Sequence, residues 1–483
     1  MDTMETIREL EPKMVWHYFA DLNAIPRASK KEALAVAFVR SFGEKHGLQT
    51  LVDQGGNVIL KKPATPGREQ HPTVILQGHL DMVHQKNAGT AFDFDTEGIR
   101  SYVDGDWVKA QGTTLGADNG IGVASILAVL ASKDLVHPPL EALFTVDEET
   151  GMSGAQNLGE GLLNGKILLN LDSEEDDELT IGCAGGLDAF SEMSYTELPT
   201  PASSVAFLIK VSGLKGGHSG VDIHLGRANA NKILIRLLYN EHTALHLSSF
   251  NGGNLRNAIP REAEAVVVIP QGGEEAFQSA FAERAAAIIQ EFLHVEPDMK
   301  LEATPCALPV SVMDPVQQGN ILKALYVVPN GVYRMSPSIP GLVETSNNLA
   351  RVEIGGGLFA TQCLQRSSVT SGIQDIAFAV RAALELAGAQ VTHSGGYPGW
   401  APNPDSAVLK LVVSVYEGLF GQAPKVAACH AGLECGIIGN HYPGLDMVSL
   451  GPTIRHPHSP DEKVQVSSVQ KFWRYLTAIL GRI

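Results

Sequence analysis

Residues 73–83 read TVILQGHLDMV, an apolar run that ends at a histidine and an aspartate. The first six of these residues are rich in apolar and β-branched side chains, which is typical of a buried parallel strand. We expect a helix over residues 120–132 (GIGVASILAVLAS) and two more strands over residues 140–146 and 166–171. A strand, a helix and two strands with short connections indicate an α/β layer with a mainly parallel sheet.

The character of the chain changes after residue 182. Alternating strand and helix patterns continue, but they are typical of a mixed α+β segment, and an internal duplication within it stays open. Apolar α/β patterns resume after residue 400. We therefore predict an α/β domain, with helices flanking its mainly parallel sheet, at residues 1–187 and 397–483, and an inserted α+β domain at residues 188–396. The elements expected beyond residue 182 are strands at 205–214, 263–270 and 447–450, a strand-rich stretch at 351–366, and helices at 228–240, 274–294, 375–387, 408–420 and 469–480.

Composition limits the partners and the location of the protein. The 483 residues carry 36 basic and 53 acidic side chains, and a net charge of −17 repels nucleic acid and anionic membranes. We therefore expect neither as a partner. The chain has no apolar stretch long enough to span a membrane, and residues 1–22 are expected to form an amphipathic helix rather than a signal peptide. Five scattered cysteines argue against a disulfide framework and favour a cytoplasmic location.

His79 and Asp81 lie two residues apart at the predicted end of a strand, so both side chains are expected on one face. One interpretation is that His79 binds a metal ion while Asp81 accepts the second ring N–H and fixes the tautomer. A buried histidine paired with an aspartate is the alternative, and this dipeptide pattern alone favours it.

Other acidic residues follow the remaining predicted strands. Asp118 and Asn119 precede the helix at 120–132, where either could be an N-cap; alternatively, Asn119 caps while Asp118 faces metal ions. Glu148 and Glu149 point in different directions after the strand at 140–146, so one could bind metal while the other moves protons. A solvated acidic loop is the alternative.

Asp172 follows the strand at 166–171, and His458 lies in a proline-rich loop, where a turn and a surface histidine are the structural alternatives. Taken together, these alternatives are less plausible. Two like charges about 4 Å apart repel by roughly 4 kcal/mol at an effective dielectric of about 20, and no lysine or arginine lies within these motifs. We therefore predict a pair of zinc-like ions that share one bridging acid, a centre suited to the hydrolysis of amide bonds.

The order of these motifs closely resembles that of the aminoacyl-histidine dipeptidases, bacterial Xaa-His dipeptidases also called carnosinase-like. They are co-catalytic zinc peptidases, a group that includes carboxypeptidase G2, aminoacylase and peptidase T. The resemblance spans about residues 10–480. It rests on HLDMV (79–83), GADNG (116–120), DEE (147–149), LDSEE (171–175), GGHSG (216–220), RNAIP (256–260), HAGLECG (430–436) and GPTIRHPHSPDE (451–462).

The resemblance implies a catalytic α/β domain with two Zn²⁺ ions, an inserted lid domain, and unblocked dipeptides such as Xaa-His as substrates. Co²⁺ or Mn²⁺ could replace zinc at such N/O ligands. It also implies a cis peptide after the bridging aspartate. The implied roles are a bridging ligand for Asp118, ligands of one ion for His79 and Asp172, ligands of the other for Glu149 and His458, a general base for Glu148, and orientation of His79 for Asp81.

The resemblance further places substrate-contacting residues on the lid. His218 would polarise the scissile carbonyl, and Arg366 would hold the C-terminal carboxylate of the dipeptide. Asn257 and Gly432 are expected to contact the substrate. The structural alternatives are a turn histidine, a salt-bridged surface arginine, a turn asparagine and a glycine required by the backbone. A homodimer is compatible with the resemblance, and whether His218 serves its own chain or a partner stays open.

Three other functions remain open from the sequence. An N-acyl amino acid deacylase or a tripeptide aminopeptidase would share the metal chemistry and differ in lid contacts. A non-catalytic metal-binding protein could keep the fold, although it would have no use for Glu148. A metal-dependent phosphoesterase would also use paired ions, but the motifs lack a basic cluster that could bind phosphate.

Overall fold

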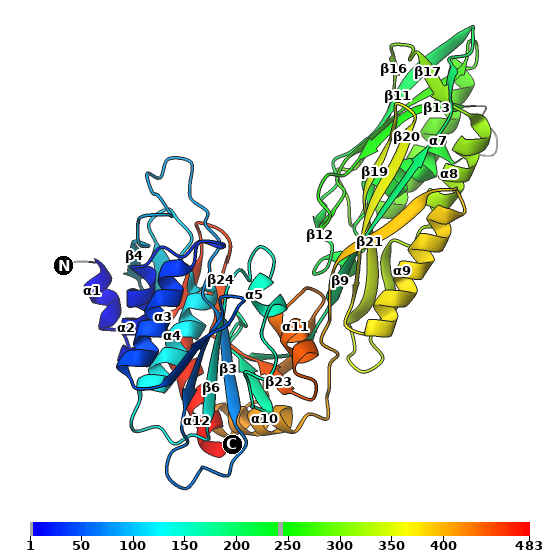
Figure 1. Cartoon of the computed structure of the whole chain (residues 1–483). Helices are drawn as coiled ribbons and strands as arrows, with labels where there is room; N and C mark the ends of the chain where they lie inside the picture. The colour runs from blue at the N-terminus through cyan, green and yellow to red at the C-terminus, as the bar shows by residue number, and fades with distance from the viewer. Residues whose placement is uncertain (1–2, 240–244) are drawn as a thin grey trace. The chain divides into compact units, whose positions relative to one another are not determined.

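The computed structural model describes residues 3–239 and 245–483, and its chain divides into two compact units. Unit 1 comprises Met1–Gly182, Pro402–Ala428 and Leu433–Ile483, and unit 2 comprises Cys183–Ala401 and Cys429–Gly432. Figure 1 shows the blue-to-cyan N-terminal part and the orange-to-red C-terminal part of the chain together in unit 1. Two ends of the sequence that are distant along the chain therefore build one unit.

Unit 1 combines helices with one large sheet and one small sheet. Its helices are α1 (Thr3–Arg8), α2 (Lys13–Asn23), α3 (Ala33–Lys45), α4 (Ala117–Ala131), α5 (Ser153–Gln156), α10 (Ala407–Phe420), α11 (Glu434–His441) and α12 (Val466–Arg482). Its strands are β1 (Gln49–Val52), β2 (Val58–Lys62), β3 (Val74–His79), β4 (Ser101–Asp104), β5 (Trp107–Ala110), β6 (Leu140–Thr145), β7 (Ile167–Asn170), β8 (Glu178–Cys183), β22 (Lys425–Cys429), β23 (Asp446–Ser449), β24 (Ile454–Arg455) and β25 (Lys463–Gln465).

The large sheet has the strand order β1-β2-β6-β3-β7-β23-β8-β22. Strands β6, β3, β7 and β23 run parallel to one another, whereas β1, β2 and β8 pair antiparallel. The predicted α/β class is confirmed, but the sheet is mixed rather than mainly parallel. The short connection at residues 53–57 explains this difference at one edge, because a parallel pair needs a crossover of roughly a dozen residues or more.

The central elements of unit 1 follow from apolar sequence. Every residue of β3 and of β6 is buried, as expected for strands covered on both faces. Helix α4 is apolar around most of its circumference and packs against both α2 and β3. The N-terminal prediction was wrong in part: α1 and α2 replace one continuous helix, because Pro12 has no N–H to continue a helix and instead precedes α2 as its N-cap. Residues 1 and 2 lie outside the described residues.

Unit 2 is built on one long sheet. Its helices are α6 (Ala230–Leu238), α7 (Glu274–Phe292), α8 (Pro315–Val327) and α9 (Thr370–Glu385), with a short 3-10 turn, η1, at Ile223–Leu225. Its strands are β9 (Gly185–Ser194), β10 (Glu197–Pro199), β11 (Ser204–Ser212), β12 (Gly217–His218), β13 (His246–Gly252), β14 (Ala258–Ile259), β15 (Ala263–Pro270), β16 (Lys300–Cys306), β17 (Ser311–Met313), β18 (Gly331–Met335), β19 (Val343–Gly355), β20 (Leu358–Ser367) and β21 (Gln390–Tyr397). Asn240, the last residue of the helix predicted at 228–240, lies outside the described residues.

Unit 2 contains the same motif twice. The first copy runs β11-α6-β13-β15-α7-β16 along the chain, and the second runs β9-α8-β19-β20-α9-β21. In the sheet the order is β16-β11-β15-β13 followed by β19-β20-β9-β21, so the second copy repeats the first in mirror-image order. The copies meet where β13 pairs antiparallel with β19. Helices α6 to α9 pack on the sheet, as Figure 1 shows for α7, α8 and α9, and they enclose one shared apolar core. The duplication that the sequence left open is therefore present.

Candidate functional site

Strand order brings three of the predicted site segments together. β3 lies between β6 and β7, and all three run parallel, so their carboxyl ends meet at one edge of the sheet. His79 is the last residue of β3, Glu148 and Glu149 follow β6, and Asp172 follows β7. Ligand sites of open α/β sheets lie at this edge.

Asp118 reaches the same place from the start of α4, and His458 reaches it from the loop between β24 and β25. Asp118 Oδ1 lies 3.2 Å from His79 Nε2, and Asp118 Oδ2 lies 3.1 Å from His458 Nε2. The peptide bond between Asp118 and Asn119 is cis, as the resemblance implied. One carboxylate therefore faces two imidazoles, one with each oxygen.

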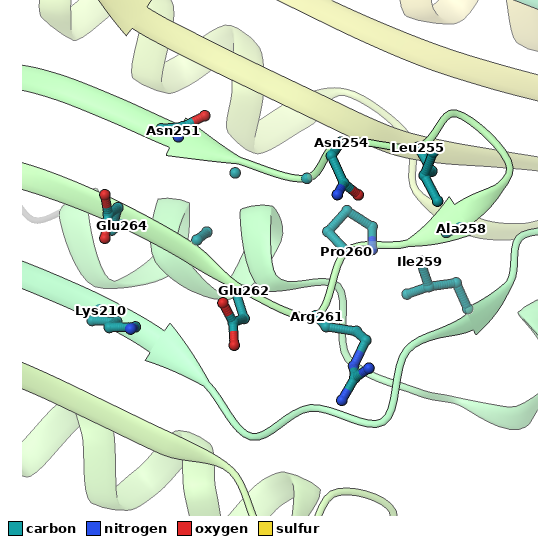
Figure 2. Close-up of a pocket in the computed structure, with 13 residues that line it drawn as sticks. Lys210, Asn251, Asn254, Leu255, Ala258, Ile259, Pro260, Arg261, Glu262 and Glu264 are labelled. Carbon is teal, nitrogen blue, oxygen red and sulfur yellow. The ribbon is translucent and has the colours of Figure 1, made fainter. Parts of the chain in front are cut away.

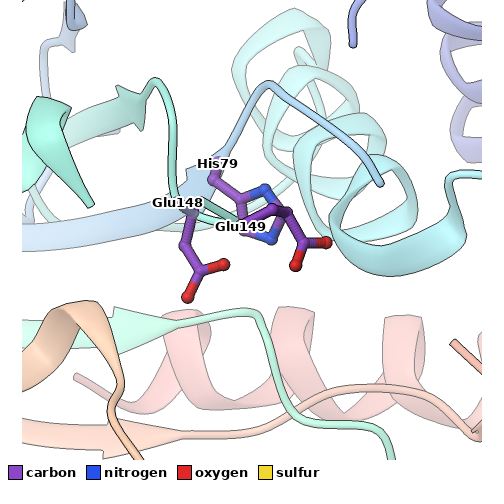
Figure 3. Close-up of side chains that lie close together, drawn as sticks. All are labelled: His79, Glu148 and Glu149. Carbon is purple, nitrogen blue, oxygen red and sulfur yellow. The ribbon is translucent and has the colours of Figure 1, made fainter. Parts of the chain in front are cut away.

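Two triads of side chains share Asp118. His79, Asp118 and Asp172 form one triad, and Asp118, Glu149 and His458 form the other. Within each triad the potential ligand atoms lie within 4.8 Å of one another, a spacing that could hold a metal ion. A third group combines His79 with Glu148 and Glu149, and Figure 3 shows the side chains of both glutamates beside the imidazole. These groups contain every residue predicted as a metal ligand, together with the proposed base.

The electrostatics of the cluster fit cations. Oε1 of Glu149 is buried without a hydrogen-bond partner, and the buried Oδ1 of Asp172 makes only a long contact with His79 Nε2 (3.4 Å), so each carboxylate retains an oxygen for a ligand. Burial and the neighbouring acids raise the pKa of Asp172 to about 6 and raise the pKa of Glu148 well above its usual range. Hydrogen bonds to Asp118 and Glu149 raise the pKa of His458 to about 11. A proton on the imidazole thus occupies a place that a cation would take.

Asp81 connects the segment that carries His79 with the segment that carries Glu148 and Glu149. Its Oδ1 lies 3.3 Å from His79 Nδ1, on the ring edge that faces away from the two triads. The same carboxylate accepts hydrogen bonds from the backbone N–H groups of Glu148 (3.0 Å) and Glu149 (3.2 Å), and from the Ser29 hydroxyl (2.8 Å). Asp81 is fully buried, so it can orient both the imidazole and the turn that carries the glutamates.

The alternative in which Asn119 caps the helix is wrong. Its side-chain amide donates to the carbonyl of Leu171 (2.6 Å), because the non-helical backbone at residues 118 and 119 turns it towards the end of β7. Glu462 takes the capping role, and its carboxylate accepts hydrogen bonds from the N–H groups of residues 115–118. Glu462 lies in the GPTIRHPHSPDE motif, but the sequence does not show which backbone groups it meets.

Sequence reasoning also missed a chain of buried polar side chains just below the triads. Glu434 Oε2 accepts hydrogen bonds from Thr145 Oγ1 (2.7 Å) on β6 and Gln77 Nε2 (2.6 Å) on β3. Asn170 Nδ2 on β7 donates to Gln77 Oε1 (2.5 Å), and Ser449 on β23 donates to Asn170. The chain crosses the four parallel strands near their carboxyl ends, two residues before His79 and Asp172, so it links the ends of those strands to one another. The only sequence signal was Glu434, within the HAGLECG motif.

In unit 2, His218 and Arg366 lie next to each other. His218 Nδ1 accepts hydrogen bonds from the N–H groups of Gly220 (3.2 Å) and Val221 (3.1 Å), which places the ring proton on Nε2. Arg366 Nη2 lies 3.4 Å from that Nε2, so two donors face the same space. Arg366 Nη1 donates to the Tyr397 hydroxyl (3.1 Å), and the buried Nε has no partner in the described structure.

This arrangement excludes one structural alternative and suits an anion. Arg366 is 4% exposed and is therefore not a surface arginine. Burial, and then the nearby guanidinium, lowers the pKa of His218, so the ring stays neutral with Nε2–H as a donor. Two converging donors without an acceptor between them match an anionic oxygen, such as that of a carboxylate.

The other two predicted substrate residues lie close to this pair. Asn257 is exposed, and its carbonyl accepts a hydrogen bond from the N–H of Ser219 (2.8 Å), directly after His218. Gly432 is half-buried in a segment that packs on the same loop, since a Cβ on Gly220 would lie 2.2 Å from the carbonyl oxygen of His430.

A cavity of about 630 Å³ lies elsewhere in unit 2, between the ends of β11, β13 and β15 and the loop that follows β13 (Figure 2). Lys210, Asn251, Glu262 and Glu264 contribute polar side chains to its wall. Its lining residues include neither His218 nor Arg366, so this cavity is separate from the pair described above.

Comparisons with known proteins show the family of this chain. The model of peptidase family M20/M25/M40 matches residues 75–482, which include all residues of the two triads. The chain belongs to peptidase family M20/M25/M40. It is 42% identical to the cytosol non-specific dipeptidase of Escherichia coli K12 over 482 residues, which cover 99% of each chain.

Two solved structures are similar to this chain over almost its whole length. The aminoacylhistidine dipeptidase from Vibrio alginolyticus matches with a TM-score of 0.94 and 44% identity, covering 99% of this chain and 98% of that one. Aminopeptidase PepT from Bacillus cereus matches with a TM-score of 0.57 and 16% identity over 98% of both chains, which shows a shared fold. Within the residues that the structure describes, no helix is long and apolar enough to cross a membrane.

Proposed function

We propose that this member of the M20/M25/M40 peptidases is a metal-dependent dipeptidase that cleaves unblocked dipeptides, with Xaa-His dipeptides among its substrates. The observation that carries the proposal is Asp118, whose two oxygens lie 3.2 and 3.1 Å from two different imidazoles and belong to two triads of potential ligands. The names of the full-length relative from Escherichia coli and of the Vibrio structure support the choice of a dipeptide as substrate.

The residues present fit a pair of divalent ions. His79 and Asp172 would hold one ion, Glu149 and His458 would hold the other, and Asp118 would bridge them. Imidazole and carboxylate ligands suit Zn²⁺, and Co²⁺ or Mn²⁺ could replace it. When bound, such ions polarise the scissile carbonyl and lower the pKa of water.

Glu148 is the proposed general base. Its carboxylate lies close to His79 and Glu149, but it is not needed in either triad that shares Asp118. It would take a proton from the attacking water and deliver it to the departing amine. Asp81 would keep His79 and the backbone of Glu148 in place while this happens.

His218 and Arg366 are the proposed substrate-recognition pair. The Nε2–H of His218 would donate to the oxygen of the scissile carbonyl as negative charge develops there. The planar guanidinium of Arg366 would bind the C-terminal carboxylate with Nε and Nη2. Its buried Nε has no hydrogen-bond partner in the described structure and is therefore free to donate to the substrate. Because the carbonyl and the carboxylate are held by adjacent side chains, a dipeptide would fit better than a longer peptide. Asn257 and Gly432 are proposed to contact the same substrate, from the same unit.

Two steps of this proposal depend on different units. The ions and the base belong to unit 1, and the recognition pair belongs to unit 2. We therefore propose that unit 2 acts as a lid whose closure over bound substrate precedes hydrolysis. We further propose a cytoplasmic location, in line with the name of the Escherichia coli relative, and a homodimer as the form to test by light scattering.

Hydrolysis of a substrate panel tests the proposal. β-Ala-His, Gly-His, an N-acetyl amino acid, a tripeptide and a phosphate monoester would each be incubated with the protein after chelation and after adding back Zn²⁺, Co²⁺ or Mn²⁺. We expect metal-dependent cleavage of both dipeptides. Preference for the acetylated amino acid or the tripeptide would instead identify a deacylase or a tripeptidase, and cleavage of the phosphate ester would identify a phosphoesterase. If the protein binds metal but turns over none of these substrates, the result would indicate a non-catalytic metal-binding protein.

A further inference from the structure

Two buried side chains of opposite charge hold the turn that carries Asp118. Glu462 Oε2 accepts hydrogen bonds from the N–H groups of Leu115 (2.7 Å) and Gly116 (2.9 Å). Glu462 Oε1 accepts them from Ala117 (2.7 Å) and from Asp118 itself (3.2 Å). The Glu462 side chain is 2% exposed, and with both oxygens it binds four consecutive backbone groups.

Arg27 binds the same turn through its carbonyl side. Its Nη2 donates to the carbonyl of Gly116 (2.6 Å), and its Nη1 donates to the carbonyls of Leu80 (3.1 Å) and Asp81 (3.2 Å). Arg27 is 1% exposed, and a Cβ on Gly116 would lie 2.5 Å from Nη2. Only glycine therefore leaves room for this contact, and the left-handed backbone at Gly116 (φ 70°) also favours glycine.

Together the two side chains connect three loops that carry proposed metal ligands. Arg27 joins the loop after His79 to the turn before Asp118. Glu462 joins that turn to the loop that carries His458, four residues earlier in the chain. Neither side chain contacts the ligand atoms of the triads. Glu462 binds backbone groups, and Arg27 binds backbone carbonyls and the Asn23 side chain (3.3 Å). Both therefore bind the backbone segments that carry the three proposed ligands.

We propose that Arg27 and Glu462 are positioning residues, which hold His79, Asp118 and His458 at metal-binding distance before any ion arrives. The inference rests on the proposed metal-dependent function. A preformed site is needed because the converging acids repel one another in the metal-free protein, and loops without such anchors would separate. Outer residues that fix ligands in this way typically contribute a factor of roughly 10 to 100 to metal affinity.

Metal affinity distinguishes positioning from two other roles. If Arg27 acted only through its positive charge, Arg27→Gln would tighten cation binding, because a buried positive charge near the site would be removed. If it only stabilised the fold, the melting temperature would fall while the affinity stayed the same. A positioning role instead predicts weaker cation binding in Arg27→Gln. This is opposite to the effect expected of a charge alone, and a role in folding alone would not change the affinity.

Glu141 provides a matched control within the same sheet. Its carboxylate, 3% exposed, accepts hydrogen bonds from the N–H groups of Asn164 (2.8 Å) and Gly165 (3.0 Å) and pairs with Lys61 (2.7 Å). Like Glu462, it is a buried carboxylate that accepts hydrogen bonds from consecutive backbone N–H groups. However, it lies near the start of β6 rather than at the edge where the triads lie. Glu141→Gln should therefore lower stability without changing metal affinity.

The experiment is a Zn²⁺ titration of the full-length apo protein against a chromogenic chelator, for wild type, Arg27→Gln, Glu462→Gln and Glu141→Gln. Each variant is first checked by circular dichroism and thermal melting. We expect affinity to fall roughly 10- to 100-fold in Arg27→Gln and Glu462→Gln, and to change less than about 2-fold in Glu141→Gln. Where a glutamine variant does not fold, Arg27→Lys and Glu462→Asp are titrated instead. Lysine keeps the positive charge but lacks the planar guanidinium, and aspartate keeps the negative charge on a shorter side chain. The same loss of affinity is expected.

Two outcomes would overturn the inference: unchanged affinity in the folded Arg27 and Glu462 variants, or tighter binding in Arg27→Gln. Neither would affect the proposed function, because wild type would still bind two ions. A wild-type protein that binds no ions would refute the proposed function itself and, with it, the role given to these residues.

Discussion

Replacing Arg366 by methionine should separate the substrates of this protein by whether they carry a free carboxylate. The guanidinium is buried, its Nη1 is bound to Tyr397, and its Nε is unpartnered. Nε and Nη2 are therefore the donors left for a substrate. Methionine has a similar length and no donor, so the change removes the charge and both bonds while keeping much of the buried volume.

The magnitude follows from the burial. A hydrogen bond to a charged partner contributes about 1.5–3 kcal/mol, and removing one partner of a buried charge pair costs about 2–5 kcal/mol or more. We therefore expect a loss of about 3–5 kcal/mol for a free dipeptide, or roughly two to three and a half orders of magnitude in kcat/KM. A dipeptide amide offers the charged guanidinium only a neutral carbonyl, a hydrogen bond of about 1.5 kcal/mol at the lower end of that range, so its loss should be roughly 10-fold.

The assay compares kcat/KM for Gly-His and Gly-His-amide, with product amines separated by chromatography. Arg366→Lys is the matched control: it keeps the positive charge but cannot form two parallel bonds, so its loss on Gly-His should be intermediate. Thermal melting checks that unit 2 still folds. Equal losses on the two substrates would refute the proposed carboxylate contact, whatever their size.

Three further outcomes are expected. Glu148→Gln should retain both bound ions and lose roughly 10²- to 10⁴-fold in kcat, as measured by elemental analysis and steady-state kinetics, because it removes only proton transfer; full activity would exclude Glu148 as the base. Metal binding should release protons and strengthen with pH. In the apo protein, protonated His458 stabilises the folded state because its pKa is raised to about 11. This stabilisation is complete below about pH 6.5 and is lost as pH rises towards 11. A bound cation replaces the proton, so calorimetry in two buffers should measure proton release on metal binding, and the absence of any release would contradict the assignment of His458 as a ligand. Mixing His218→Ala with Arg366→Ala protein should restore no activity, because one chain supplies both side chains; recovery would show that they come from different subunits.

Sequence patterns predicted the part of the site that depends on strand ends. His79, Glu149 and Asp172 follow apolar runs, and parallel neighbours bring such ends together, so their meeting follows from the fold class. Asp118 and His458 could be placed only by resemblance, because one lies at the start of a helix and the other in the loop between two strands of a small antiparallel sheet. No local pattern indicates that these two loops meet the same edge.

The positioning residues could not be found in this way, for a physical reason. Arg27 and Glu462 act on backbone groups, which are the same in every sequence, so no spacing of side chains identifies their partners. The Asn119 prediction failed for a related reason. A polar residue before a helix is usually an N-cap, but here a distant carboxylate satisfies the free N–H groups and releases the amide for another bond.

The duplicated sheet of unit 2 explains how two distant residues form one recognition pair. His218 on β12 pairs with Ala258 on β14, whose carbonyl accepts a hydrogen bond from Asn348 Nδ2 (2.8 Å) on β19. Strand β19 in turn pairs Ser346 with Arg366 on β20. The first copy of the motif thus supplies the histidine, the second supplies the arginine, and the β13–β19 pairing joins them. A register slip of two residues would move one copy by about 6.8 Å, at about 3.4 Å per residue. That is twice the 3.4 Å between the two donors, so the pairing of the copies, rather than a flexible loop, sets the distance that a dipeptide would have to match.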